Sequence, residues 1–274
     1  MASILTNNSA MNALKTMRSV NSQMQENQDR ISTGLKVSSG KDNAAYFSIS
    51  KTMGGDSGMF KSIDEGLTLT QNSVKTARVG AENVEDLTRQ FSERVAFAQS
   101  DAVDRAEVQK ELDELAARVQ TTIDQSTFNG NDLVSGAAST QTVITGISRA
   151  GGSFGTTSIT FSSVNLQAIQ STLANINVNT TGSLSAALDT VEGALNDAID
   201  AATSLGVAEK SIETQKDFLK NLTDTLDSGI GSMVDADMEE EAARSQSLQV
   251  QQQLATQSLS MANQQPQSLL SLFG

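Results

Sequence analysis

The chain has 274 residues, a formal net charge of −13 at pH 7 and 38% hydrophobic residues. This is enough apolar material for one or two domains of packed helices. The negative charge argues against nucleic acid or an anionic membrane surface as a partner, because either would require a basic face.

The sequence contains neither histidine nor cysteine. The commonest general base, thiol nucleophiles, disulfides and the commonest transition-metal ligand are therefore missing. We expect no enzyme activity, no cofactor and no metal site. An acidic cluster at Asp235, Asp237, Glu239, Glu240 and Glu241 lacks the glycine and the spacing of a calcium loop. It is interpreted as a solvated first helical turn.

No apolar run approaches the eighteen or more residues of a membrane span, so we expect no membrane insertion. The first residues, MASILTNNSAMNALK, also lack the basic, apolar and small-residue order of a cleaved secretion signal. From composition alone, the expected location is the cytoplasm.

Residues 4–35 predict one amphipathic helix that ends near Gly34, where glycine can adopt the left-handed conformation. Its apolar residues recur at helical spacing: Met11, Leu14, Met17, Val20, Met24 and Ile31. The following stretch resembles a phosphate-binding loop only superficially. Five residues, not four, separate Gly34 from Gly40, and Asp42 would place a negative charge against the ligand.

The middle of the chain predicts long helices and one β-rich region. Helical periodicity covers residues 56–99, 104–124 and 184–226, and the pair Asn129-Gly130 predicts a turn. Residues 135–182 are rich in Gly, Ser and Thr, and their runs TVITGIS and SITFSSV indicate β-hairpins. The long apolar stripe of 184–226 is expected to be buried against 56–124 in an antiparallel bundle.

The C-terminal residues show coiled-coil spacing. One seven-residue ladder runs through Leu248, Ala255, Ala262 and Leu269, and a second through Gln252, Leu259, Pro266 and Phe273. Pro266 is expected to kink or break this helix. No charged side chain follows Arg244. Either this Gln-rich tail is disordered, or it is a helix crowded by copies of itself, where like charges would repel; the regular ladder favours the second interpretation.

Three segments together resemble bacterial flagellin, the subunit of the flagellar filament: ILTNNSAMNAL near the N-terminus, ISTGLKVSSGKDNAA, and QSLSMANQQPQSLLSLFG at the C-terminus. The resemblance implies a mainly α fold, an elongated antiparallel helical rod with N- and C-terminal coiled-coil helices and a small β-hairpin region. It further implies that 1–40 and 230–274 form a filament core, and that 41–229 form a rod domain with its hairpin region at about 135–182.

The resemblance also implies roles for particular residues. The expected inner-core assembly residues are Ile4, Met11, Leu14, Met24, Ile31, Leu248, Leu259, Leu269 and Phe273. Residues 34–49 would form a spoke between the first helix and the rod, in which Gly34, Asp42, Asn43 and Ala44 set geometry and neighbour packing.

Head-to-tail self-assembly into a swimming filament is the function that the resemblance implies. The partners would be other flagellin subunits, the flagellar export apparatus, an export chaperone, the filament cap and hook-associated proteins. The protein would then be secreted to the extracellular flagellum without a cleaved signal, with its ends disordered until assembly. The alternatives are a hook–filament junction protein, a soluble coiled-coil adaptor and, last, a hydrolase using Ser and Lys.

Overall fold

The computed structural model describes residues 7–100, 103–149, 154–179 and 184–273. The chain divides into two compact units: unit 1 combines Met1–Asp56 with Thr225–Gly274, and unit 2 is Ser57–Asp224. Among the described residues there are six α-helices and one two-stranded sheet. The expected mainly helical fold with a small hairpin is confirmed. The filament-core division at 40/41 and 229/230 concerns an assembly and stays a prediction.

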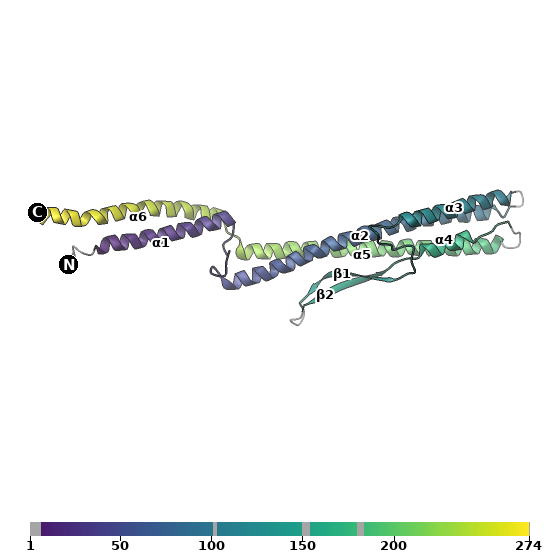
Figure 1. The fold of residues 1–274 in the computed structure, drawn as a ribbon, viewed down its shortest axis with the longest axis horizontal. Helices are drawn as coiled ribbons and strands as arrows, with labels where there is room; N and C mark the ends of the chain where they lie inside the picture. Colours follow the sequence, from purple (N-terminus) through teal and green to yellow (C-terminus); the bar gives the residue numbers. More distant parts are fainter. Residues whose placement is uncertain (1–6, 101–102, 150–153, 180–183, 274) are drawn as a thin grey trace. The chain divides into compact units, whose positions relative to one another are not determined.

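Unit 1 contains α1, Asn8–Thr33, and α6, Met238–Phe273, which lie side by side in antiparallel order with both chain ends at the same end of the pair (Figure 1). Asn7 caps α1 by accepting a hydrogen bond from the Ala10 N–H at 3.0 Å. Gly34 ends the helix with φ of 71°, and its N–H donates to the Arg30 carbonyl. The predicted helix end at Gly34 is confirmed.

Backbone hydrogen bonds join the segment that follows α1 to the segment that precedes α6. Leu35 pairs with Asp235 in an antiparallel bridge, and the Ala236 N–H donates to the Gly34 carbonyl at 2.9 Å. The Val234 carbonyl accepts from the N–H groups of Lys36, at 2.7 Å, and Val37. We call this region, residues 34–37 with 234–236, the main-chain clasp.

Two helix boundaries differ from the sequence prediction. Helix α2, Ala44–Phe97, begins well before residue 56, so the last part of the expected spoke is helical. Helix α6 continues past Pro266 to Phe273, so the predicted break there is wrong. Proline leaves the carbonyl four residues earlier without its usual N–H donor. The Asn7 side-chain amide supplies that bond instead, donating to the Ala262 carbonyl at 2.8 Å.

In unit 2, α2 and α5, Leu184–Val234, run antiparallel. Their cross-helix contacts fix the register: Arg78 bonds Glu209 at 2.6 Å, and Lys216 donates to the Gln71 side chain at 2.9 Å. Helix α3, Arg105–Gln125, begins after the N-cap Asp104, as expected. The apolar stripes that periodicity identified are buried: Leu67, Val74, Phe91, Val108, Leu112, Val119, Ile123, Leu205, Ile212 and Leu219.

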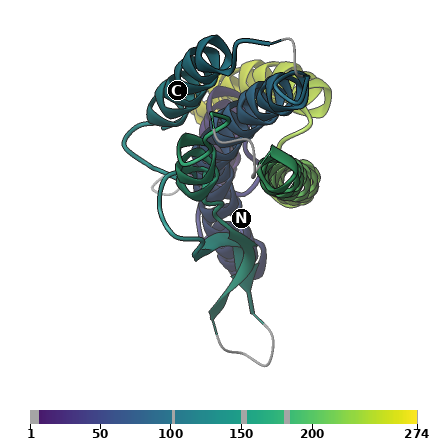
Figure 2. The ribbon, with the colours of Figure 1, turned by 90° about the vertical axis from the view of Figure 1, so that its right-hand side faces the viewer.

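The region at 135–182 contains one hairpin and a short helix that the sequence prediction missed. Strands β1, Thr140–Ser148, and β2, Gly155–Ser162, pair antiparallel with a register irregularity between Ile144 and Gly146. The hairpin projects away from α3 (Figure 2). Its Thr145 carbonyl accepts from the Gln215 side chain of α5 at 3.0 Å, which ties it to the helices.

The missed helix is α4, Leu166–Ala174. Asn165 caps it through the Ala168 N–H, and it packs on α3, where Gln120 and Gln167 exchange hydrogen bonds. The predicted turn at Asn129-Gly130 is confirmed: both residues have positive φ, 49° and 76°, between the paired Phe128 and Asn131.

Candidate assembly surface

The described part of the two C-terminal ladders lies on the side of α6 that faces α1 within the same chain. Leu248 is only 4% exposed and Ala255 is 7% exposed. Leu259 is half-buried on the same side. The Gln252 side chain donates to Asn21 of α1 at 2.8 Å. Leu248 and Leu259 therefore stabilise the pairing of the two terminal helices, and their role between subunits stays a prediction.

Helix α1 divides its apolar residues between two sides. Val20 is buried and Met24 and Ile31 are half-buried, at the 3–4 spacing that faces α6. Met11, at 62% exposed, and Leu14, at 37%, lie outside that contact. The single apolar stripe predicted from the sequence thus covers two surfaces, of which one contacts α6 and the other is exposed.

Helix α6 carries a second apolar line on its far side. Val250, Leu254 and Met261 are 55%, 59% and 61% exposed. They are four and then seven residues apart, which places them on one face, opposite the face that carries Leu248 and Ala255. We call these three residues the outer stripe. The sequence pattern did not reveal the outer stripe, because the two heptad ladders already explained the coiled-coil spacing.

The acidic cluster is only partly a solvated turn. Asp237 caps α6 by accepting from the N–H groups of Glu239 and Glu240. Glu241, in contrast, is 5% exposed and bonds to Asn27 and Arg30 of α1. The interpretation as a solvated turn is therefore wrong for Glu241. The available signal was its position, seven residues before Leu248 in the first ladder.

The expected spoke residues build the start of α2. The Asp42 carboxylate accepts hydrogen bonds from the N–H and hydroxyl groups of Ser39 and Ser38, which hold the pKa of Asp42 below its ordinary value. Asn43 caps α2 by accepting from the N–H groups of Ala45 and Tyr46 at 3.1 Å. Ala44 is the exposed first residue of α2. This is capping geometry, in which the N–H groups of Ser38 and Ser39 already donate to a protein carboxylate.

Three of the expected core residues lie outside what the structure describes. Ile4 precedes the described residues, and the side chains of Leu269 and Phe273 are not described, although both residues fall within α6.

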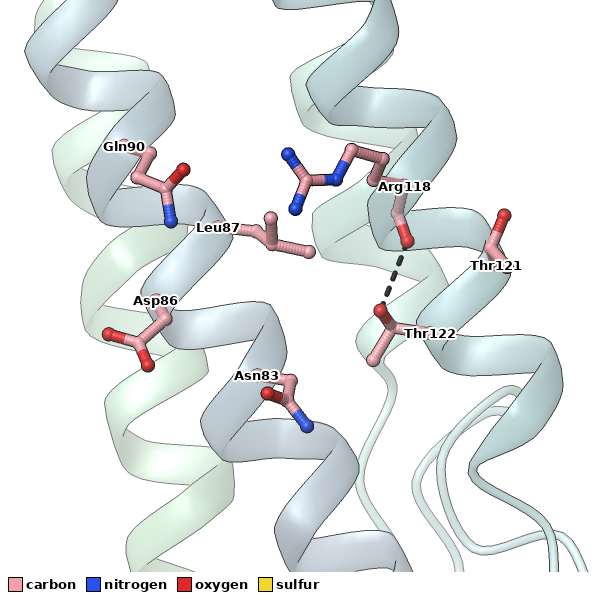
Figure 3. A pocket seen from close by; sticks show the side chains of 7 residues that line it. All are labelled: Asn83, Asp86, Leu87, Gln90, Arg118, Thr121 and Thr122. Carbon is pink, nitrogen blue, oxygen red and sulfur yellow. Dashed lines mark hydrogen bonds between the residues drawn. The ribbon is translucent and has the colours of Figure 1, made fainter.

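A shallow groove runs between α2 and α3, and Figure 3 shows the Arg118 side chain extending across it toward α2. The hydroxyl of Thr122 is already bonded to the Arg118 carbonyl at 3.0 Å. Amides, hydroxyls and single charges line the groove, without a nucleophile beside a base: Asn83, Asp86, Leu87, Gln90, Arg118, Thr121 and Thr122. Nearby, Arg89 pairs with Asp86 and Glu93, and Arg94 with Glu111, as ordinary surface ion pairs.

Comparison with known proteins settles the family. The model of the bacterial flagellin N-terminal helical region matches residues 4–139, and that of the C-terminal helical region matches residues 188–273. The chain belongs to the flagellin family. This flagellin is a structural subunit of the flagellar filament, where it assembles with other flagellin subunits outside the cell.

Relatives from alphaproteobacteria match this flagellin along its whole length. The flagellin of Brucella melitensis is 34% identical over 100% of this chain and 99% of its own. Flagellin A of Rhizobium meliloti is 30% identical over 100% of both chains, and flagellin FljM of Caulobacter vibrioides is 32% identical over 99% and 98%.

A solved structure, described as a putative flagellar hook-associated protein from Vibrio parahaemolyticus, covers 72% of this flagellin and 99% of its own chain. At 12% identity and a TM-score of 0.49 it favours no function over another. Within the described ranges no helix is long and apolar enough to cross a bilayer. Among the same residues, no cluster of three or more Asp or Glu side chains is arranged so that it could hold a metal ion.

Proposed function

We propose that the outer stripe of α6, together with Met11 and Leu14 of α1, forms the contact through which subunits add to the filament. The observation that carries this proposal is the outer stripe itself: three large apolar side chains more than half exposed on one helix face. Fully burying such a side chain contributes about 1.5–3 kcal/mol. An assembly contact is the simplest use for this surface in a flagellin.

The polar residues of α6 support a crowded environment. Beyond Arg244 the polar residues are Gln, Ser, Thr and Asn, and no side chain is charged. Neutral polar groups can pack against identical helices without repulsion, whereas like charges in a polymer would lie close to their own copies. Contacts that add head to tail without closing produce an open helical polymer.

The pairing of α1 and α6 is expected to depend on assembly. Among the residues of α1 and α6 whose burial the structure describes, the buried apolar ones are Val20, Leu248 and Ala255, and amide groups add hydrogen bonds across the pair. So few buried groups give a helix pair little stability of its own. We propose that the ends are mobile in the free subunit and become ordered in the filament.

Export is part of the proposal. We propose that this flagellin leaves through the flagellar export apparatus, accompanied by an export chaperone, and meets the filament cap and hook-associated proteins outside the cell. The mobile ends favour this route, because a narrow channel passes unfolded segments more easily than a packed pair of helices.

The test compares two neutral substitutions on adjacent exposed positions of α6. Leu254→Gln removes an outer-stripe side chain, and Gln253→Ala is the matched control beside it. Purified subunits are seeded with short filament fragments, and polymer is measured by sedimentation and electron microscopy. We expect Leu254→Gln to raise the critical concentration about tenfold or more, and Gln253→Ala to change it little. Equal polymer yields from the two variants would exclude the outer stripe as an assembly contact.

A further inference from the structure

Glu241 is a buried charge whose side-chain hydrogen bonds come from the other terminal helix. Its Oε2 accepts from the Asn27 side-chain amide at 2.6 Å, and its Oε1 accepts from Arg30 Nη1 at 3.2 Å. The same Asn27 amide also donates to the Glu241 backbone carbonyl at 2.9 Å. Asn27 is 3% exposed and Glu241 is 5% exposed, so water has little access to this cluster.

Charged neighbours complete the cluster. Arg30 is held from its own helix by Glu26 at 2.6 Å, and Arg244 approaches Glu241 at 4.0 Å and Glu240 at 3.8 Å. Among the described residues every buried side-chain polar atom has a partner. The cluster is therefore fully satisfied in this one alignment of the two helices.

We propose that Asn27, Arg30 and Glu241 form a register lock that selects one alignment of α1 against α6. The apolar side chains alone discriminate poorly. The α1-facing side of α6 repeats small and medium residues every seven positions, Leu248, Ala255 and Ala262, so a slip by one heptad would still bring apolar groups together.

A slip has a very different effect on the lock. If α6 moved one heptad in one direction, Asn27 would face Leu248; moved in the other direction, Glu241 would face Val20. Either shift leaves a buried polar or charged group without its partner, which is far more costly than a mismatch of apolar side chains. A single buried polar residue is known to specify register in coiled coils for this reason.

The position of the lock adds to its effect. The lock lies next to the main-chain clasp, where residues 34–37 are hydrogen-bonded to residues 234–236 of the same chain. Because each helix is continuous, the alignment of α1 and α6 at this end also sets their alignment toward the termini. It determines which residue of α1 lies opposite each residue on the α1-facing side of α6, whereas the outer stripe stays outside in every heptad register.

The absence of cysteine from the sequence allows a direct test. The in-register reporter is Asn21→Cys with Gln252→Cys, whose side chains are bonded in the structure. Two reporters of a one-heptad slip are Asn21→Cys with Ser245→Cys and Asn21→Cys with Leu259→Cys. Each is treated with a short thiol cross-linker, as free subunits and as filaments. Only the internally cross-linked single chain is scored, so polymer yield is measured separately.

The lock is then removed without weakening the apolar contact, by Asn27→Leu with Glu241→Leu. The matched control is Glu240→Leu, one residue earlier and exposed. In the intact lock and in the control we expect the in-register product to exceed the slipped products at least tenfold. In the double-leucine chain we expect the ratio to fall to about twofold.

Three results would overturn the proposal. The first is a double-leucine chain that keeps strict in-register cross-linking. The second is a control that loses register as the double-leucine chain does. The third is an intact chain that cross-links in no register, whether free or assembled. A failure to polymerise would count against the outer-stripe contact instead, because cross-linking within one chain does not require it.

Discussion

At the scale of single residues, polar side chains decide what the apolar pattern leaves open. Asn7 is an example: its side chain both accepts from the Ala10 N–H, as the α1 cap, and donates to the Ala262 carbonyl of α6. The second bond replaces the one that Pro266 cannot make. A proline that predicts a break in isolation is thus tolerated because a residue more than 250 positions away supplies the missing donor.

We predict that Asn7→Ala loosens α6 beyond Ala262 and that Pro266→Ala suppresses the effect. Loss of the amide leaves the Ala262 carbonyl without a donor at a cost of about 1 kcal/mol, whereas an alanine at 266 restores the backbone N–H. The measurement is backbone hydrogen exchange of residues 258–273 in filaments, which should be faster in Asn7→Ala. A double-mutant cycle with no coupling between the two sites would contradict the explanation.

A second residue-scale prediction concerns acid. Burial opposes ionisation of Glu241, but hydrogen bonds from Asn27 and Arg30 and the charges of Arg244 and Arg30 outweigh it and keep the pKa of Glu241 below its ordinary value. The stabilisation is therefore fully present above that ordinary value, and it is lost as the pH falls through the lowered pKa.

The matched variant is Glu241→Gln, which resembles the protonated side chain. Near pH 7 we expect the paired ends of the native chain to be more stable than those of the variant by about 1–3 kcal/mol. The difference should shrink as the pH is lowered below about 4. Urea unfolding of filaments, followed by circular dichroism across this range, measures it. A pH-independent difference would show that ionisation of Glu241 is not its source.

At the scale of elements, close approach of helices α2 and α3 depends on Gly80. A Cβ added there would lie 2.0 Å from the Ser126 hydroxyl and 2.5 Å from its Cβ. Ser126 is the buried C-cap of α3, so it has little room to move. Glycine in the middle of a helix destabilises it by about 1 kcal/mol relative to alanine. At position 80 the missing side chain leaves room for Ser126.

Gly80→Ala should therefore destabilise unit 2 by about 1–3 kcal/mol in spite of its better helix propensity. The control is Gly66→Ala in the same helix, where an added Cβ meets nothing within 4 Å. That change should stabilise by up to about 1 kcal/mol. Midpoints of urea unfolding distinguish the two. Adding Ser126→Gly to Gly80→Ala should recover most of the loss, and no recovery would point to another cause.

Local signals explain which elements could be predicted from the sequence. Gly34, the apolar periodicity of residues 104–124 and the β-branched runs of the hairpin are signals within each segment, so they predicted where α1 ends and where α3, β1 and β2 lie. Helix α4 has a local signal too, Asn165 before apolar residues at helical spacing, but the surrounding Gly, Ser and Thr residues obscured it.

The candidate site depended on partners far away in the sequence. Glu241 looks like any other acidic residue of a first helical turn until Asn27, 214 positions earlier, is placed beside it. Met11 and Val20 belong to the same predicted apolar pattern, yet a separation of nine residues places them on opposite sides of α1, and only Val20 is buried. Periodicity identifies an apolar face, whereas the choice between an internal and an external partner requires the three-dimensional structure.

At the scale of the whole molecule, the uncharged tail of α6 gives a prediction for the polymer. Gln253→Lys with Gln257→Lys brings the net charge of the subunit closer to zero, which by itself would favour association. If copies of α6 lie close together, the added charges will instead repel one another locally. We expect polymer to form poorly at 0.05 M salt and to recover near 1 M, where screening acts within about 3 Å.

The acidic pair Gln253→Glu with Gln257→Glu should show the same salt dependence, and Gln253→Ala with Gln257→Ala should show none. Sedimentation of seeded polymer at several salt concentrations provides the measurement. Lysine variants that polymerise normally at low salt would mean that these faces of α6 stay apart in the filament.

The discontinuous unit 1 also has a consequence for the order in which the chain folds. Unit 2 is one continuous segment, whereas unit 1 needs both ends of the chain. When a chain emerges with its N-terminus first, α1 appears first and the last residues of α6 appear last. Helix α1 therefore has no helix to pair with until emergence is nearly complete. Contacts this distant in sequence also form slowly. The fold thus contains a built-in delay, because the pairing of α1 with α6 is completed last.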